Sequence, residues 1–370
     1  MSDRPRVVIV NRGSIILPPG DPLSAPLPGS EVVAINLAHG LAASGVPVTY
    51  IGNHRGSTLT GVQFRQVTEL ASVPDGTDLR VVWLRDYAAP DVTFARFPQA
   101  RHFLLSEDSA DDLRALSRWP VARIRARLHD IAAAANGVVF ASEWHRTDWE
   151  SRLGVRVPRG RVIYNLASHV PWRLDPPDAP RHRIIHTSHP RKALAAVAEI
   201  ATRLVPDGFE VTCLSNPSLY QEESRRIVRP SPQGPINLGT FADFAAAHRR
   251  VLRFQAPVPP RRIIDLLDRH GIFLHPDYSG EVGATTVIEA IRRGTIPVVS
   301  DFGALPELVA DAGIVISGPA WSDEFADRCA DAIRQLRHVD VTTFEKGRRA
   351  LIARFSDDAL LAQWRDLLGI

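Results

Sequence analysis

The sequence predicts an α/β fold with two doubly wound parallel-sheet domains that face each other across a cleft. Apolar runs alternate with helical patterns along most of the 370 residues, which is typical of strands buried on both faces of a parallel sheet. The alternation occurs twice, in two halves of similar size, and a chain of this length is too long for one small core.

The first half opens with Val7–Val10, a β-branched run typical of a buried strand. A loop rich in proline and glycine follows, and residues 31–45 then show helical periodicity that ends at Gly45. Residues 46–52 form the next expected strand and complete a strand–helix–strand unit. Further strands are expected at residues 79–84, 102–105 and 137–142.

Prolines cluster at residues 170–181, as is typical of a linker. The second half repeats the alternation, with strands expected at 183–188, 209–215, 272–275 and 295–300 and helices at 192–204, 261–270 and from about 284. We therefore expect a first domain at 1–172, a linker at 173–180 and a second domain at 181–354. The last helix, at 355–370, is expected to cross back to the first domain.

Composition excludes several classes of protein. The 44 basic and 41 acidic residues are interleaved, so no nucleic-acid partner is expected. The two cysteines are too few for a disulfide framework or a four-cysteine zinc site. No leader peptide and no long apolar segment is visible, so we expect a cytoplasmic monomer or homodimer without an integral membrane segment. Arginine-rich usage with two lysines is typical of a bacterial genome of high GC content.

The most informative segment is EVGATTVIEAIRRG, residues 281–294, which follows a predicted strand. Ligands of open parallel sheets bind outside the carboxyl ends of the strands. The first N–H groups of a helix have no intrahelical partner, so a helix that starts there suits a diphosphate. Gly283 permits close approach of the backbone, and Thr285 and Thr286 add hydroxyl donors.

Two glutamates in this segment suit the hydroxyl groups of sugars. Glu289 lies four residues after Thr285, so both share one helix face, and its carboxylate can accept hydrogen bonds from a ribose. Glu281 would reach a sugar beyond the diphosphate. The alternative is an amphipathic helix with solvated glutamates. Against it, Glu289 stands between Ile288 and Ala290, where a structural residue is more often apolar.

These features resemble a known family. The spacing of the two glutamates, the run AIRRGTIPVVSDFGALPE that follows and the Pro-Gly-Ser-Glu sequence at 28–31 are similar to those of retaining GT-B glycosyltransferases of glycosyltransferase family 4. The resemblance covers nearly the whole chain and is most specific from Phe273 to Leu308. It implies two Rossmann-like domains and transfer of a sugar from a nucleotide-diphosphate donor with retention of the anomeric configuration.

The resemblance also implies roles for individual residues. Glu281 would contact the donor sugar, Glu289 the ribose, and Gly283, Ala284, Thr285 and Thr286 the diphosphate and sugar. The segment TSHPRKAL at 187–194, which contains Ser188, corresponds to a cationic pattern of the family. Arg191 and Lys192 in this segment would neutralise the departing diphosphate without a metal ion. Ala193 replaces a glycine of the family pattern.

Further donor contacts are expected from Gly29 and Ser30 on the other domain and, near the nucleobase, from Val258. The alternative for Ser30 is that it caps the following helix. A histidine that the family commonly has after the fourth strand of the first domain is absent. At the position of this histidine the sequence has Arg85 and Asp86. At the end of the next strand it has Glu107 and Asp108. We expect an acidic surface for the acceptor there, unless Ser106 or Ser109 and the acidic residues only cap a helix.

The sequence therefore predicts a metal-independent hexosyltransferase-type enzyme without a cofactor, in which Arg191, Lys192 and Glu281 are the catalytic residues. The donor would be a UDP-, GDP- or TDP-linked sugar. The basic helix expected at 118–136 has a modest apolar face, so a small soluble acceptor such as a specialised metabolite is preferred to a lipid. A nucleotide-sugar epimerase or a catalytically idle sugar-nucleotide binding protein are the alternatives.

Overall fold

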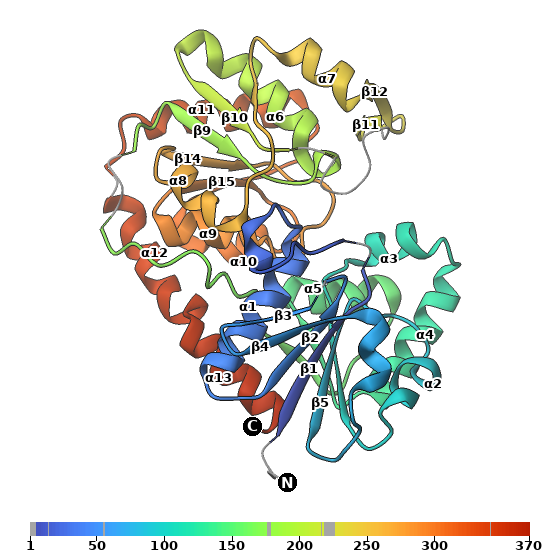
Figure 1. Cartoon of the computed structure of the whole chain (residues 1–370). Coiled ribbons are helices and arrows are strands. Elements are labelled where there is room, and N and C mark those ends of the chain that lie inside the picture. The colour runs from blue at the N-terminus through green and yellow to red at the C-terminus, as the bar shows by residue number, and fades with distance from the viewer. Residues whose placement is uncertain are drawn as a thin grey trace. The chain divides into compact units, whose positions relative to one another are not determined.

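Figure 1 shows a computed structural model of the chain, which describes residues 5–13, 15–54, 56–175, 179–215, 217, 226–340 and 342–370. The chain divides into two compact units. Unit 1 comprises residues 1–168 and 355–370, and unit 2 comprises residues 169–354. Each unit is built on a parallel sheet, which confirms the predicted α/β class.

The sheet of unit 1 has the strand order β3–β4–β2–β1–β5–β6–β7–β8. Its strands pair in parallel, except that β3 and β4 form an antiparallel hairpin. The strands are β1 (Arg6–Asn11), β2 (Val48–Gly52), β3 (Ser57–Leu59), β4 (Val62–Gln66), β5 (Leu79–Leu84), β6 (Arg101–Leu105), β7 (Gly137–Phe140) and β8 (Gly160–Val162).

The central strand β1 explains why the first apolar run is continuous. Val7 and Ile9 pack in the core on one face of the sheet, and Val8 and Val10 pack in the core on the other. Because side chains of a strand alternate between faces, a strand covered on both sides needs apolar residues at every position.

Helices cover both faces of this sheet: α1 (Gly29–Ala43), α2 (Pro90–Thr93), α3 (Ala110–Ser117), α4 (Val121–Ala134), α5 (Glu143–Asp148) and α13 (Asp357–Leu368). The last helix, α13, lies beside α1 (Figure 1) and buries Leu360 and Trp364 in the same core. A Cβ atom at Gly40 of α1 would lie 2.6 Å from the side chain of Leu361, so the glycine lets the two helices approach closely.

The sheet of unit 2 has the order β13–β10–β9–β14–β15–β16, with parallel pairing. Its strands are β9 (Arg183–His186), β10 (Glu210–Cys213), β13 (Arg253–Phe254), β14 (Ile272–His275), β15 (Ile296–Ser300) and β16 (Ile314–Ile316), and a separate antiparallel ribbon consists of β11 (Arg226–Arg229) and β12 (Ile236–Thr240). The helices are α6 (Pro190–Leu204), α7 (Phe241–His248), α8 (Ile263–Leu267), α9 (Thr285–Arg293), α10 (Leu305–Val309), α11 (Asp323–Leu336) and α12 (Thr342–Phe355).

The passage from unit 1 to unit 2 lies at Ser168, before the proline cluster. The backbone N–H of Arg173 donates to the carbonyl of Arg292 at 2.9 Å, and the Arg348 guanidinium donates to the carbonyl of Arg173 at 2.6 Å. This segment therefore packs on unit 2. Residues 176–178 of the expected linker lie outside the described residues. Within the described part of the chain, no helix combines the length and the apolar surface that spanning a membrane requires.

Candidate functional site

The loop between β14 and α9 in unit 2 is held in one conformation by Asp277. This carboxylate is buried, and its Oδ1 accepts hydrogen bonds from the N–H and the hydroxyl of Ser279. Its Oδ2 accepts from the backbone N–H of Glu281 at 2.9 Å. Asp277, which lies just after the end of the buried strand β14, therefore fixes the position of the Glu281 backbone.

A second support for this loop comes from the sequence run that follows β15. The backbone N–H of Ala304 donates to the carbonyl oxygen of Glu281 at 2.8 Å. Gly303 has a φ of +65°, and a Cβ atom there would lie 2.7 Å from the same oxygen. The glycine is needed for both its backbone conformation and the close approach of the Glu281 backbone.

Lys192 and Glu281 form an ion pair across the carboxyl edge of the sheet. Lys192 lies in the first turn of α6, after β9, and its Nζ donates to Glu281 Oε2 at 2.5 Å. The Nε2 atom of His275 lies 3.7 Å from the same oxygen. Burial alone would raise the pKa of the Glu281 carboxyl, but Lys192 and then His275 hold this pKa well below its ordinary value. Glu281 is therefore a carboxylate at neutral pH.

Glu289 is also buried, and it has a partner that the sequence analysis did not identify. Its Oε1 lies 2.9 Å from Nε2 of His169, whose side chain is fully buried. His169 precedes Glu289 by 120 residues. It lies after β8, at the start of unit 2.

Two buried histidines lie at the carboxyl edge of the sheet near Glu281. The ring centroids of His186 and His275 are 5.9 Å apart, and His186 Nδ1 lies 2.8 Å from the carbonyl oxygen of Leu274. Burial, with a smaller contribution from His275, lowers the pKa of His186 to about 3. His186 is therefore an uncharged imidazole at neutral pH.

The other donor-binding candidates of unit 2 lie around these residues. Gly283, Ala284 and Thr285 are buried at the start of α9, and Thr286 is half-buried. The carbonyl of Ser188, between β9 and α6, accepts a hydrogen bond from Ser215 at 2.6 Å. Val258 is half-buried in the segment after β13. The backbone of Arg191 lies in α6, but its side chain is outside the described part of the structure.

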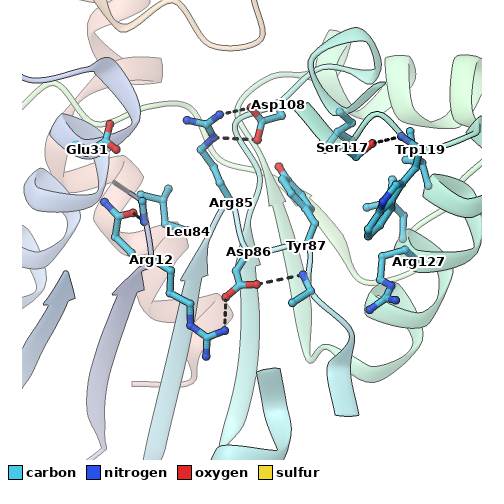
Figure 2. A pocket seen from close by; sticks show the side chains of 16 residues that line it. Arg12, Glu31, Leu84, Arg85, Asp86, Tyr87, Asp108, Ser117, Trp119 and Arg127 are labelled. Atoms are coloured by element: carbon cyan, nitrogen blue, oxygen red, sulfur yellow. Dashed lines mark hydrogen bonds and ion pairs between the residues drawn. The ribbon is translucent and has the colours of Figure 1, made fainter. Parts of the chain in front are cut away.

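Unit 1 has a cavity of its own at the carboxyl ends of β1 and β5, with a volume of about 500 Å³ (Figure 2). Side chains from α1, α3, α4 and the β5–α2 loop surround it. The lining residues are Asn11, Arg12, Gly13, Glu31, Leu84, Arg85, Asp86, Tyr87, Ala88, Asp108, Leu113, Ser117, Trp119, Ile124, Arg127 and Leu128.

Two of the carboxylates that line this cavity, Asp86 and Asp108, are paired with arginines. Arg85 donates from Nε and Nη2 to the two oxygens of Asp108 at 2.9 and 2.6 Å, and Arg12 lies 3.2 Å from Asp86. Burial alone would lower the pKa of Arg85, but Asp108 raises it above its ordinary value. Glu107 accepts from the side-chain amide of Asn165 at 3.2 Å. The expected acidic surface at Asp86 and Asp108 is therefore neutralised within the protein.

One family of known proteins matches the segment that carries most of the unit 2 site. Residues 246–340 match the family model of the glycosyl transferases group 1. This segment of the chain is similar to the glycosyl transferases of group 1. No curated protein matches the sequence of the chain.

Solved structures similar to this chain cover almost its whole length and have the GT-B fold. Sucrose-phosphate synthase from Thermosynechococcus elongatus is 14% identical, covers 99% of this chain and 98% of its own, and has a TM-score of 0.67. HepE from Anabaena, in complex with UDP-glucose, is 13% identical over 98% of this chain and 99% of its own, with a TM-score of 0.70. WaaG, a glycosyltransferase involved in lipopolysaccharide biosynthesis, is 14% identical over 98% and 99%, with a TM-score of 0.63.

In unit 1, the segment FASEWHRTDW at residues 140–149 positions Asp108. His145 Nδ1 accepts from the N–H of Ala141 at 3.3 Å, so the ring proton is assigned to Nε2, which lies 2.9 Å from the carbonyl oxygen of Asp108. The indole N–H of Trp149 donates to the same carbonyl at 3.1 Å. Burial lowers the pKa of His145 to about 4, so the ring is neutral at pH 7.

The two helix caps expected from the sequence, at Ser30 and at Ser109, turn out differently. Helix α1 begins at Gly29 with Pro28 at the N-cap, and the Ser30 hydroxyl donates to Glu31 Oε2 at 2.9 Å. The interpretation of Ser30 as an N-cap is therefore wrong, because the residue already lies inside the first turn. Ser109 does cap α3, where it forms a reciprocal capping box with Asp112.

The matched segment contains Glu281, Gly283, Glu289 and Gly303, whereas Lys192 lies before it. The structure brings Lys192 and Glu281 together, although they are 89 residues apart in the sequence. The candidates Gly29, Ser30, Arg85, Asp86, Glu107 and Asp108 belong to unit 1. There, Arg85 connects Asp108 to Ser30, whose hydroxyl lies 3.4 Å from Arg85 Nη1.

Proposed function

We propose that this protein is a glycosyltransferase that moves a sugar from a nucleotide-diphosphate sugar to a small soluble acceptor, with retention of the anomeric configuration and without a metal ion. The observation that carries this proposal is the Lys192–Glu281 ion pair of 2.5 Å at the carboxyl edge of the unit 2 sheet, beside the start of α9. A cation, a carboxylate and a helix N-terminus at one edge suit a diphosphate that carries a hydroxylated sugar.

In this proposal, unit 2 holds the donor. Lys192, with Arg191 next to it in the sequence, exchanges its interaction with Glu281 for one with the diphosphate. Glu281 then accepts hydrogen bonds from the sugar hydroxyls, and Glu289 accepts them from the ribose. The complex of HepE with UDP-glucose supports a UDP-linked sugar as the first donor to test.

The chemical step forms a bond between an acceptor hydroxyl oxygen and the anomeric carbon. The bond between that carbon and the diphosphate oxygen breaks, and the leaving diphosphate takes the electron pair and then the acceptor proton. Stabilisation of the leaving group by positive charge is the main contribution that the protein makes. Attack from the side of the leaving group retains the configuration.

The preference for a soluble acceptor rests on α4, the basic helix of unit 1. Its apolar residues Ile124, Leu128 and Ile131 are buried in the unit's own core. A helix that inserts into a lipid surface needs an accessible apolar face, and this one has its apolar face occupied.

The experiment is a thermal-shift panel of UDP, GDP, TDP and their sugars, followed by turnover assays with and without EDTA. We expect Lys192→Ala to lower turnover by about 10²–10³-fold and to reduce the shift given by the diphosphates. Lys346→Ala, at the exposed second lysine in α12, is the matched control. Near wild-type turnover in Lys192→Ala or Glu281→Ala, or products of inverted configuration in their NMR coupling constants, contradict the proposal. Conversion of the donor without an acceptor would indicate an epimerase.

A further inference from the structure

The unit 1 cavity has the size of a small-molecule site. Its volume of about 500 Å³ lies within the roughly 300–1,000 Å³ that ligand pockets enclose. It opens at the carboxyl ends of β1 and β5, where parallel sheets bind ligands. Arg85, at the end of β5, has a φ of +50°. A non-glycine residue in this left-handed region is uncommon and concentrates at functional sites.

The walls of the cavity are largely apolar. Four aliphatic side chains that are almost completely buried form part of it: Leu84, Leu113, Ile124 and Leu128. Two half-buried aromatic residues, Tyr87 and Trp119, also line it. In Figure 2, Tyr87 lies between two groups of side chains. Glu31 and Arg12 lie on one side of Tyr87, and Trp119 and Arg127 lie on the other side. Such a lining binds a flat apolar body by burial and ring contacts.

The charges around the cavity do not favour an anionic ligand. Arg85 and Arg12 are each engaged by a carboxylate that also lines the cavity, Asp108 and Asp86. A phosphate would have to displace these carboxylates and leave them next to its own negative charge. Arg127, in turn, lies 5.9 Å from the centroid of the Trp119 ring, where its charge interacts with an aromatic face.

One end of the cavity offers a polar contact suited to a hydroxyl group. The side chain of Glu31 is buried in the first turn of α1, and one of its oxygens accepts from Ser30. A carboxylate in this position can accept a hydrogen bond from a ligand hydroxyl. The cavity thus combines largely apolar walls with a hydrogen-bond acceptor at one end.

We propose that this cavity binds the acceptor and that the acceptor is an uncharged hydroxyaryl compound. Its ring system lies against Tyr87 and Trp119, and its hydroxyl group lies at the Glu31 end. This inference rests on the proposed function, because it names the class of molecule that receives the sugar. It distinguishes hydroxyaryl acceptors from polyols such as myo-inositol and from sugar phosphates.

The test measures binding of 4-methylumbelliferone to the full chain by isothermal titration calorimetry, with myo-inositol and glucose 6-phosphate as comparison probes. We expect 4-methylumbelliferone to bind and the other two not to bind. Trp119→Ala should weaken its binding about tenfold or more, and Trp119→Phe should retain it within a few-fold. Trp321→Ala, at a half-buried tryptophan of unit 2, is the matched control. Ala88→Trp, which fills the cavity, should abolish binding while circular dichroism stays native.

The outcomes separate this inference from the proposed function. Binding of UDP, measured by thermal shift, reports on unit 2 and should be equal in the Trp119 variants. If UDP binds and the sugar is transferred to myo-inositol or glucose 6-phosphate but not to 4-methylumbelliferone, the inference is overturned and the proposed function stands. Binding of 4-methylumbelliferone that is unchanged in both Trp119→Ala and Ala88→Trp also overturns it. If no nucleotide binds, the proposed function fails and so does the acceptor role.

Discussion

His169 and Glu289 give the proposed donor site a residue whose effect can be measured separately. The imidazole contacts one carboxylate oxygen of Glu289 at 2.9 Å in a buried environment. It does not itself need to touch the donor, so we regard it as a positioning residue. Loss of a hydrogen bond to a buried charged group costs about 1.5–3 kcal/mol.

We expect His169→Ala to raise the KM for a ribonucleotide donor about tenfold and to leave kcat nearly unchanged. The KM for the matching 2′-deoxyribonucleotide donor should rise less, because it offers one hydroxyl group fewer to Glu289. Steady-state kinetics with UDP- and dUDP-linked sugars measure both effects. His169→Asn, which keeps a side-chain donor, should restore much of the affinity. Equal losses for the two donors would argue for a general effect on stability instead.

Single residues were also where prediction from sequence reached its limit. Glu281, Glu289 and Lys192 are candidates from the sequence because their residue types are unusual in their surroundings: two carboxylates near an apolar helix, and one of two lysines. Their proposed roles stay predictions. The contacts His169–Glu289 and Arg85–Asp108 were not identified. Histidine and arginine are common in this sequence, and nothing local marks which of them will meet a carboxylate far along the chain.

Among the elements, the loop between β14 and α9 depends on Gly303, a glycine in the loop between β15 and α10. Any other residue at Gly303 costs free energy for two reasons. Its φ of +65° is unfavourable for a residue with a Cβ atom, and that Cβ atom would lie 2.7 Å from the Glu281 carbonyl oxygen. The first cost is about 1–2 kcal/mol. The second requires the Glu281 backbone to move, which also moves its carboxylate.

We therefore expect Gly303→Ala to lower the unfolding free energy by about 2–4 kcal/mol and to weaken UDP binding. Urea unfolding and thermal shift measure the two quantities. Gly45→Ala is the control, because Gly45 has a φ of +82° and an added Cβ atom has no neighbour within 4 Å. This control should show the conformational cost alone. Equal losses in both variants would mean that the Glu281 loop adapts without cost.

The elements differ in how well their sequence predicts them. The runs at 79–84 and 272–275 coincide with β5 and β14. A strand buried on both faces is apolar along most of its length, and Arg80 and His275 are the polar residues of these two runs. The hairpin of β3 and β4 and the ribbon of β11 and β12 were missed. Most residues of their strands are half-buried or exposed, so their patterns mix polar and apolar residues and resemble those of loops.

At the scale of the whole molecule, two buried neutral histidines make stability depend on pH. The pKa of His145 is lowered to about 4 and that of His186 to about 3, from an ordinary value of 6.5. Between these values the unfolded chain binds more protons than the folded one. Stability is therefore fully present above about pH 6.5 and falls as the pH is lowered towards the folded-state values.

From pH 7 to pH 5 we expect each histidine to remove about 2 kcal/mol of unfolding free energy. Urea denaturation at a series of pH values measures this slope. His186→Asn should remove the part of this pH dependence that comes from His186, whatever effect the substitution has on the unfolding free energy at pH 7. An unfolding free energy that does not change between pH 7 and pH 5 would show that the two imidazoles are not held neutral.

The two lysines make the protein its own internal standard for chemical labelling. Lys192 is engaged by Glu281, whereas Lys346 lies on the exposed surface of α12. An amine-reactive reagent therefore has two side chains to modify, and mass spectrometry can report their ratio from a single digest. If a diphosphate takes Lys192 from Glu281, the ratio will change with each candidate nucleotide. The donor could then be identified before any acceptor is known.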